Sequence, residues 1–217
     1  MKRDEALDII LATKVIAVIR MSDPAKLRLV VEAIRKGGVM AIEITMTTPG
    51  ALDSIRALAA AKPAGVLIGA GTVVDAAAAR SVIEAGADFV VSPVLDHDVI
   101  RICRDRDTFV APGAFTATEI LDAWRSGADV VKVFPATAVG PKYFKDLKGP
   151  FPDIRLMPTG GVNMENARDF LAAGACCVGI GTALVDAKAV EAGDWEALET
   201  RARVLVASLT SSGPSAG

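Results

Sequence analysis

The chain has 217 residues, of which 52% are hydrophobic, and its formal net charge at pH 7 is −2. This length and apolar content predict one domain with a large buried core. The nearly balanced charge argues against a nucleic-acid or membrane-surface partner, and no apolar run approaches the roughly 20 residues that a membrane span needs.

The N-terminal segment, residues 1–14, is too charged and too short in its apolar run for a signal peptide. Its Leu7, Ile10 and Leu11 have the spacing of one face of an amphipathic helix. We therefore expect a short helix here, ahead of the main fold.

Apolar runs with little polar alternation recur along the rest of the chain, as is typical of strands covered on both faces. The segments that carry them are 15–20, 36–45, 65–72, 85–93, 108–113, 126–135, 154–161 and 173–181. Several follow a glycine that suits the end of a preceding helix, because glycine tolerates the positive φ found there.

Helical segments separate these runs, at 24–36, 50–61, 75–85, 96–106, 116–126, 141–148, 163–173 and near 194–209. Asp23, Thr48 and Asn163 stand at candidate N-cap positions, and proline follows the first two. The alternation predicts an α/β fold of the (β/α)8 TIM-barrel type, a single domain over 1–217 with about 210–217 as a frayed tail. An open doubly wound sheet is the alternative.

Lys132 stands in the middle of the buried run "ADVVKVFPA". An unpaired buried charge costs several kcal/mol, so this position needs an explanation. Burial lowers the pKa of a lysine, and the neutral amine can then attack a ketone to form a Schiff base. We therefore predict that Lys132 is a covalent catalyst that needs no other cofactor.

Glu43 is the candidate proton carrier for that reaction. Side-chain alternation puts Glu43 on one face with Thr45, and Lys132 on one face with Phe134. If both faces point into the barrel, Glu43 and Lys132 meet near its mouth. The alternative is a structural Lys–Glu ion pair, and an ionised Glu43 would raise the lysine pKa against the effect of burial.

Two glycine motifs, "MPTGGVN" (157–163) and "GIGTAL" (179–184), predict an anion site. Their glycines let backbone N–H groups approach a ligand, and Asn163 can start a helix whose N-terminus favours anions. Loops after the seventh and eighth strands are the usual phosphate site in barrels. The alternative is a pair of tight turns with no ligand.

The cysteine and histidine content argues against a metal site. Cys103, Cys176 and Cys177 form no C-x-x-C pair, and His97 is the only histidine. We interpret the thiols as reduced core residues of a cytoplasmic protein, and we expect no metal. The "GAGTVV" stretch lacks the full spacing of a dinucleotide fingerprint, so a turn that carries an active-site Thr72 is favoured.

Taken together and in order, several motifs resemble those of the KDPG/KHG aldolase family. They are IEIT, IGAGTV, VVSP, PGAFTATE, VKVFPA, GPKYFK, MPTGGV and GIGTAL, and the likeness covers roughly residues 5–210. Members are class I enzymes that cleave 2-keto-3-deoxy-6-phosphogluconate (KDPG) or 4-hydroxy-2-oxoglutarate (KHG). The resemblance implies pyruvate plus an aldehyde (glyceraldehyde 3-phosphate or glyoxylate) as products, no metal, and a homotrimer.

By this likeness Lys132 is the Schiff-base lysine and Glu43 the general acid–base residue. Arg20 and Thr72 match positions that contact the keto-acid carboxylate region. The likeness also assigns Pro93 and Phe134 to the pocket wall, and Thr159, Gly160, Gly161, Gly181 and Thr182 to the phosphate or distal group of the substrate.

One residue departs from the family pattern. Members best known for KDPG cleavage carry arginine in the turn after the glutamate, where this chain has Thr47. Losing a guanidinium there removes a bidentate carboxylate partner. KDPG, its galactonate epimer and KHG all remain open as substrates.

Two other classes of function are alternatives to an aldolase. Another phosphate-binding barrel, of the epimerase or thiamine-phosphate synthase type, leaves Lys132 unexplained, and such an epimerase would want metal-binding histidines that this chain lacks. A barrel that only senses a phosphorylated acid would have the same pocket, so activity alone separates it from an enzyme.

Overall fold

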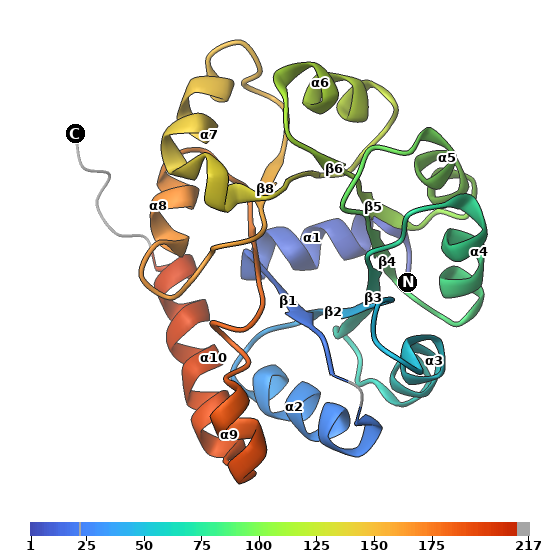
Figure 1. The fold of residues 1–217 in the computed structure, drawn as a ribbon, viewed down its shortest axis with the longest axis vertical. Helices are drawn as coiled ribbons and strands as arrows, with labels where there is room; N and C mark the ends of the chain where they lie inside the picture. Colours follow the sequence, from blue (N-terminus) through green and yellow to red (C-terminus); the bar gives the residue numbers. More distant parts are fainter. Residues whose placement is uncertain (22, 212–217) are drawn as a thin grey trace.

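The computed structural model describes residues 1–21 and 23–211, and the predicted tail lies mostly outside them. The strands form a ring with the helices around it (Figure 1). They are β1 (Val15–Ile19), β2 (Ala41–Thr45), β3 (Leu67–Gly71), β4 (Phe89–Val91), β5 (Phe109–Ala111), β6 (Gly113–Ala114), β7 (Val131–Val133), β8 (Leu156–Pro158) and β9 (Val178–Ile180).

All strand pairs are parallel, in two sheets with the orders β5-β4-β3-β2-β1-β9 and β6-β7-β8. β5 and β6 are one predicted strand that is interrupted at Pro112, which has no N–H to donate. The Pro112 carbonyl still accepts from the Lys132 N–H. On the other side, a bridge between Thr159 and Gly179 joins β8 to β9. The predicted barrel is therefore confirmed as a closed ring.

The α-helices lie outside the ring, apart from the first. They are α1 (Arg3–Thr13), α2 (Pro24–Lys36), α3 (Ala51–Ala61), α4 (Ala76–Glu84), α5 (His97–Asp105), α6 (Ala117–Arg125), α7 (Gly140–Lys148), α8 (Ala167–Ala172), α9 (Ala187–Ala192) and α10 (Trp195–Thr210), with a 3₁₀ turn, η1, at Ala136–Ala138. Within the described residues, no helix is long and apolar enough to cross a membrane.

Two of the three predicted N-caps are wrong. Asp23 does cap α2, accepting from the N–H groups of Ala25 and Lys26. The helix after Thr48 begins later, at Ala51, because Gly50 takes a left-handed φ of 71° and acts as the N-cap. Asn163 does not start α8. Its side chain accepts from Glu165 and Asn166 in a turn, and the helix begins only at Ala167.

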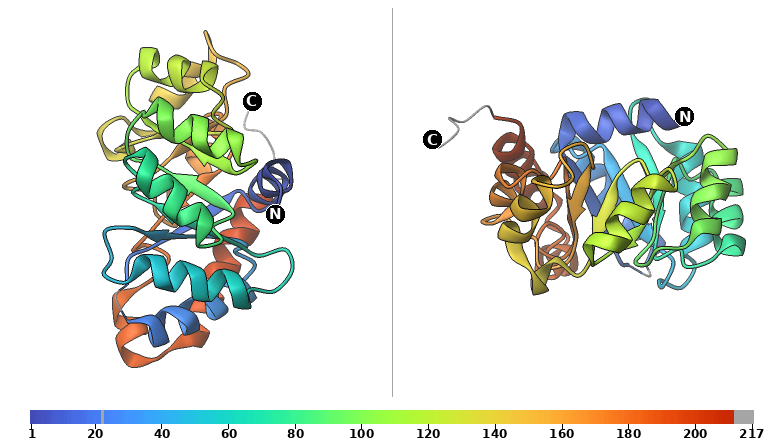
Figure 2. Two further views of the ribbon diagram at one scale, coloured as in Figure 1. Left: turned by 90° about the vertical axis from the view of Figure 1, so that its right-hand side faces the viewer. Right: turned by 90° about the horizontal axis from the view of Figure 1, so that it is seen from above.

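One end of the barrel is sealed by apolar side chains and by α1, which lies across it (Figure 2). From α1, Ala6 and Ile10 enter this inner cluster. The strands contribute Ile16, Ala41, Leu67, Phe89, Val91, Phe109, Ala111, Val130, Met157 and Cys177. Because Ala41 and Val130 point inward, alternation makes Glu43 and Lys132 point inward as well, further toward the carboxyl ends of the strands.

Candidate active site

Lys132 lies at the centre of β7, between Gly113 of β6 and Met157 of β8 in the strand register. The residue is only 5% exposed. Its Nζ atom lies 4.9 Å from the centroid of the Phe134 ring, which is partly exposed at the barrel mouth. The amine is therefore inside the barrel and directed toward the open end, as the sequence pattern predicted.

Glu43 enters the same interior from β2 and is 2% exposed. Its carboxylate lies over Gly71 of β3, so closely that a Cβ atom at Gly71 would overlap it. Only glycine leaves space for the carboxylate at this position. Gly71 is not among the site residues predicted from the sequence, although "GAGT" contained the signal: a glycine that faces inward in a buried strand often marks a close approach.

Burial controls the protonation of both groups. It lowers the pKa of Lys132, with the negative charge of Glu43 acting in the opposite direction. Burial also raises the pKa of Glu43, opposed by the positive charges of Lys132 and then Arg20. Within the described chain the two groups interact through their charges and share no hydrogen bond. Both pKa shifts therefore run toward the uncharged forms, the opposite of what a stabilising ion pair would produce.

A cavity of about 450 Å³ opens at the carboxyl end of these strands. It is lined by Val18, Ile19, Arg20, Thr45, Phe134, Thr159, Gly160, Gly161, Val162, Asn163, Gly179, Gly181, Thr182, Ala183 and Val185. Thr45 and Phe134 each stand two residues beyond the buried pair, on the same strand faces. Arg20 is the one charged residue among the described residues that line it, so the cavity suits an anionic ligand.

The Thr159 hydroxyl lacks a hydrogen-bond partner in the described part of the chain, although the residue is only 8% exposed. It packs against Gly179, where a Cβ atom would overlap it. Gly160 and Gly161 follow at φ values of 88° and 74°, which side chains disfavour. An unpaired buried hydroxyl is costly, so a ligand in this cavity is the natural partner for Thr159.

Three other predicted site residues, Thr72, Pro93 and Thr47, are not among the residues that line this cavity. Thr72 follows β3 with φ at 59°, a strained conformation for a β-branched residue. The Pro93 backbone packs against Gly113. Thr47 is exposed and does not line the cavity, but its hydroxyl donates to Thr45 at 3.4 Å. Thr45 itself is buried and lines the cavity, as its alternation with Glu43 indicated.

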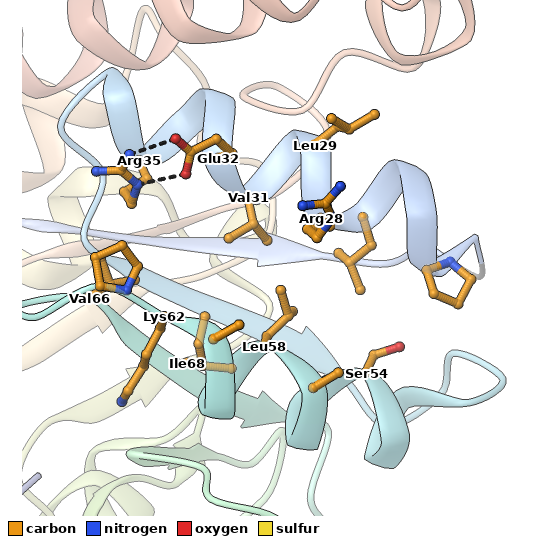
Figure 3. A pocket seen from close by; sticks show the side chains of 15 residues that line it. Arg28, Leu29, Val31, Glu32, Arg35, Ser54, Leu58, Lys62, Val66 and Ile68 are labelled. Atoms are coloured by element: carbon orange, nitrogen blue, oxygen red, sulfur yellow. Dashed lines mark hydrogen bonds and ion pairs between the residues drawn. The ribbon is translucent and has the colours of Figure 1, made fainter.

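A second hollow, of about 290 Å³, lies between α2 and α3 on the outside of the barrel (Figure 3). Its walls are mostly apolar, with Val31 on α2, Leu58 on α3 and Ile68 on β3. Arg35 donates twice to Glu32 at its edge, at 2.9 and 2.7 Å. None of the predicted site residues lines this hollow.

Gly71→Ala should lower kcat about 10²–10⁴-fold if Glu43 has the acid–base role predicted from the sequence, because the added methyl group displaces its carboxylate. Steady-state kinetics measure this loss, and borohydride trapping should still show the lysine adduct. Gly149→Ala is the matched control, since neither glycine has a left-handed φ and a Cβ atom at Gly149 would make only an ordinary contact, 3.4 Å from the Asp146 carbonyl oxygen. Equal losses in both variants would mean that the added methyl group acts on folding and not through Glu43.

Known proteins share the sequence pattern of this chain over most of its length. The family model for "KDPG and KHG aldolase" matches residues 7–201. A 2-dehydro-3-deoxy-phosphogluconate aldolase from Pseudomonas aeruginosa is 38% identical over 192 residues, which cover 88% of this chain and 86% of that protein. A KHG/KDPG aldolase from Escherichia coli K12 is 38% identical over 177 residues, covering 81% and 82%.

A solved structure gives the same result for the fold. It is the KDPG aldolase from Legionella pneumophila, with pyruvate captured as a covalent carbinolamine intermediate. It superimposes with a TM-score of 0.85 at 29% identity, over 92% of this chain and 97% of that one. With the family model matching almost the whole barrel, the chain belongs to the KDPG and KHG aldolase family.

Proposed function

We propose that this chain is a class I aldolase that reversibly cleaves a 2-keto-3-deoxy acid through a Schiff base on Lys132. The observation that carries the proposal is the buried amine with its lowered pKa, which faces the Glu43 carboxyl inside the barrel. Such an amine is a nucleophile near neutral pH. The iminium supplies the electron sink, so the reaction needs no metal and no organic cofactor.

The steps follow from these two groups. The neutral Lys132 amine adds to the C2 carbonyl to give a carbinolamine. The protonated Glu43 carboxyl then gives its proton to the carbinolamine hydroxyl, so that water leaves, the iminium forms and Glu43 becomes a carboxylate. Glu43, as carboxylate at that stage, accepts the proton of the C4 hydroxyl while the C3–C4 bond breaks and its electrons form an enamine. The aldehyde leaves, the same carboxyl returns a proton to C3, and water hydrolyses the pyruvate imine to restore the amine.

The cavity lining supports an anionic substrate. Arg20 lines the cavity and would bind the carboxylate, and the Thr159 hydroxyl with the glycine loops at 160–161 and 181–182 would hold a phosphate or another distal anion. We propose KDPG as the leading substrate, with KHG and the phosphogalactonate epimer as the others. Thr47 supplies no guanidinium, so Arg20 serves the carboxylate alone.

A substrate panel tests this proposal. The enzyme is incubated with each of the three acids, and pyruvate release is followed with lactate dehydrogenase. We expect pyruvate from at least one of them, with one kcat/KM well above the others. If none releases pyruvate while the phosphorylated acids still protect the chain against heating, the barrel is a sensor and not an enzyme.

Thr159→Val should lower kcat/KM for a phosphorylated substrate by about 10–100-fold, the loss of one hydrogen bond to a charged group. The folded chain should become slightly more stable, because the variant removes a buried hydroxyl without a partner in the described structure. Kinetics on phosphorylated and unphosphorylated substrates measure the first effect, and thermal unfolding the second. A parallel loss on both substrates would contradict a phosphate role for Thr159.

We further propose that the chain forms a homotrimer. Three apolar side chains are exposed on the neighbouring loops after β3, β4 and β6: Val74 at 49%, Val94 at 48% and Phe115 at 39%. Exposed apolar groups that gather on adjacent loops favour an interface. This surface is separate from the lining of the proposed substrate cavity.

Phe115→Glu combined with Val94→Glu should convert the trimer to monomers, because burying two carboxylates in an apolar interface is unfavourable. Light scattering after size exclusion measures the mass. Val204→Glu, which alters a 57% exposed valine on α10, is the control and should leave the trimer intact. A wild-type chain that elutes as a monomer at micromolar concentration would exclude the trimer.

A cytoplasmic location is also proposed. It is supported by the free cysteines of the described chain, Cys103, Cys176 and Cys177. Free thiols persist where the surroundings are reducing.

A further inference from the structure

We propose that Cys176 and Cys177 form a redox modification site, a vicinal dithiol that a hydroperoxide converts reversibly to a disulfide. The pair lies just before β9, at the end of the barrel opposite the substrate cavity. It has no part in the proposed aldolase reaction and does not depend on it.

The first observation is the position of the sulfur atoms. In an extended strand, adjacent side chains point to opposite faces. Here the chain bends at Cys176, and the two Sγ atoms lie 3.8 Å apart in hydrogen-bonding contact. Closing a disulfide of about 2.05 Å therefore needs the two sulfur atoms to approach by about 1.8 Å.

The second observation is an internal repeat around Cys176. The phrases "AGAD", "SGAD" and "AGAC" place Asp88, Asp129 and Cys176 at equivalent positions before three strands. The two carboxylates each accept from a strand N–H, of Ile68 and Val110. Each also has a basic partner, Lys62 for Asp88 and Arg3 for Asp129. This rim of the barrel therefore presents cations to an anionic side chain, and at the third position that side chain is a thiol.

The surroundings of Cys176 keep this electropositive character. Its thiol is affected first by Cys177 and then by the charges of Arg155 and Lys148, which together hold the pKa of Cys176 below its ordinary value despite burial. Low-pKa, partly accessible thiols are the ones that peroxides oxidise. Cys176 is half-buried and meets both conditions.

Cys177 is suited to the second role, that of the resolving thiol. It is buried in the inner cluster beside Met157, and the adjacent Cys176 together with burial raises its pKa. Cys177 is therefore the harder of the two thiols to ionise. Cys103 provides a contrast, because burial raises the pKa of that thiol to about 12 and it has no cysteine neighbour in the described chain.

The chemistry balances with a hydroperoxide as oxidant. The Cys176 thiolate attacks the terminal oxygen of ROOH, the O–O bond breaks, and a proton from water gives the sulfenic acid and ROH. The Cys177 sulfur then attacks the sulfenic sulfur, a disulfide forms, and water leaves with the Cys177 proton. Adjacent Cα atoms are only about 3.8 Å apart, below the usual range of about 4.4–6.8 Å for disulfides, so the bond is strained and easily reduced.

The test uses hydrogen peroxide on the full chain, followed by alkylation, digestion and mass spectrometry. We expect the peptide with Cys176 and Cys177 to become unalkylated and lighter by two hydrogen atoms, while Cys103 stays alkylated. Dithiothreitol should restore alkylation. In Cys177→Ser, dimedone should label Cys176 as a sulfenic acid. In Cys176→Ser, Cys177 should react no faster than Cys103.

Loss of alkylation at Cys176 and Cys177 of the wild-type chain before any loss at Cys103 supports the proposed site. Dimedone labelling confined to Cys176 supports it as well. Oxidation of all three thiols at one rate, or a pair that remains fully alkylated under peroxide, overturns it. Because the main readout comes from the wild-type chain, a variant that fails to fold does not remove the test.

Discussion

Lys132→Met should abolish the pyruvate adduct that borohydride traps on the wild-type chain, and should lower kcat/KM by about 10⁴-fold or more, the scale of losing a covalent nucleophile. The reason is that the reaction needs a nitrogen inside the barrel, and methionine fills the same space without one. Peptide mapping after incubation with pyruvate and borohydride locates the adduct, and a coupled pyruvate assay measures turnover.

Lys145→Met is the matched control, because Lys145 is exposed on α7 and its loss should leave both trapping and turnover unchanged. An adduct that persists in Lys132→Met on another lysine would move the nucleophile elsewhere. Retained turnover without any adduct would rule out the Schiff-base mechanism itself.

The same variant should be more stable than the wild type near neutral pH. Lys132 has a folded-state pKa below its ordinary value of 10.5, so between those two pH values the folded chain binds fewer protons than the unfolded chain. The free energy of unfolding therefore rises with pH across that window, and at lower pH the buried lysine destabilises the folded chain. Lys132→Met removes this destabilisation. Breaking a structural ion pair would instead lower the unfolding temperature.

Glu43→Gln should still form the trapped imine on Lys132 but turn over about 10²–10⁴-fold more slowly, the usual contribution of a positioned acid–base group. The amide has nearly the same shape and cannot carry the proton between the C4 hydroxyl and the enamine carbon. Single-turnover trapping and steady-state kinetics, compared on one preparation, separate the two effects.

Glu84→Gln, on the exposed face of α4, is the control and should behave as the wild type. Unchanged turnover in Glu43→Gln would assign Glu43 a structural role. Loss of both imine and turnover would instead mean that Glu43 is needed for the addition of the amine to the ketone.

Local patterns predicted most of the barrel. The apolar runs before Glu43 and around Lys132 became β2 and β7, because strands covered on both faces need continuous apolar sequence. Asp23 followed by proline predicted the start of α2 correctly. The predictions were wrong where tertiary contacts prevailed, as at Asn163, whose side chain closes a turn beside the cavity. α9 was not predicted, since only its packing distinguishes so short a helix from a loop.

The sequence by itself determined that Glu43 shares a strand face with Thr45, and Lys132 with Phe134, because side chains alternate along a strand. Only the tertiary structure decided that both faces point into the barrel, and in which direction the pKa of each group shifts. Burial by the whole ring opposes the attraction between the two charges, and burial prevails at both residues. Both groups are buried because strands far apart in the chain come together around them and exclude water. Gly71, on the neighbouring strand, leaves the space that the Glu43 carboxylate occupies.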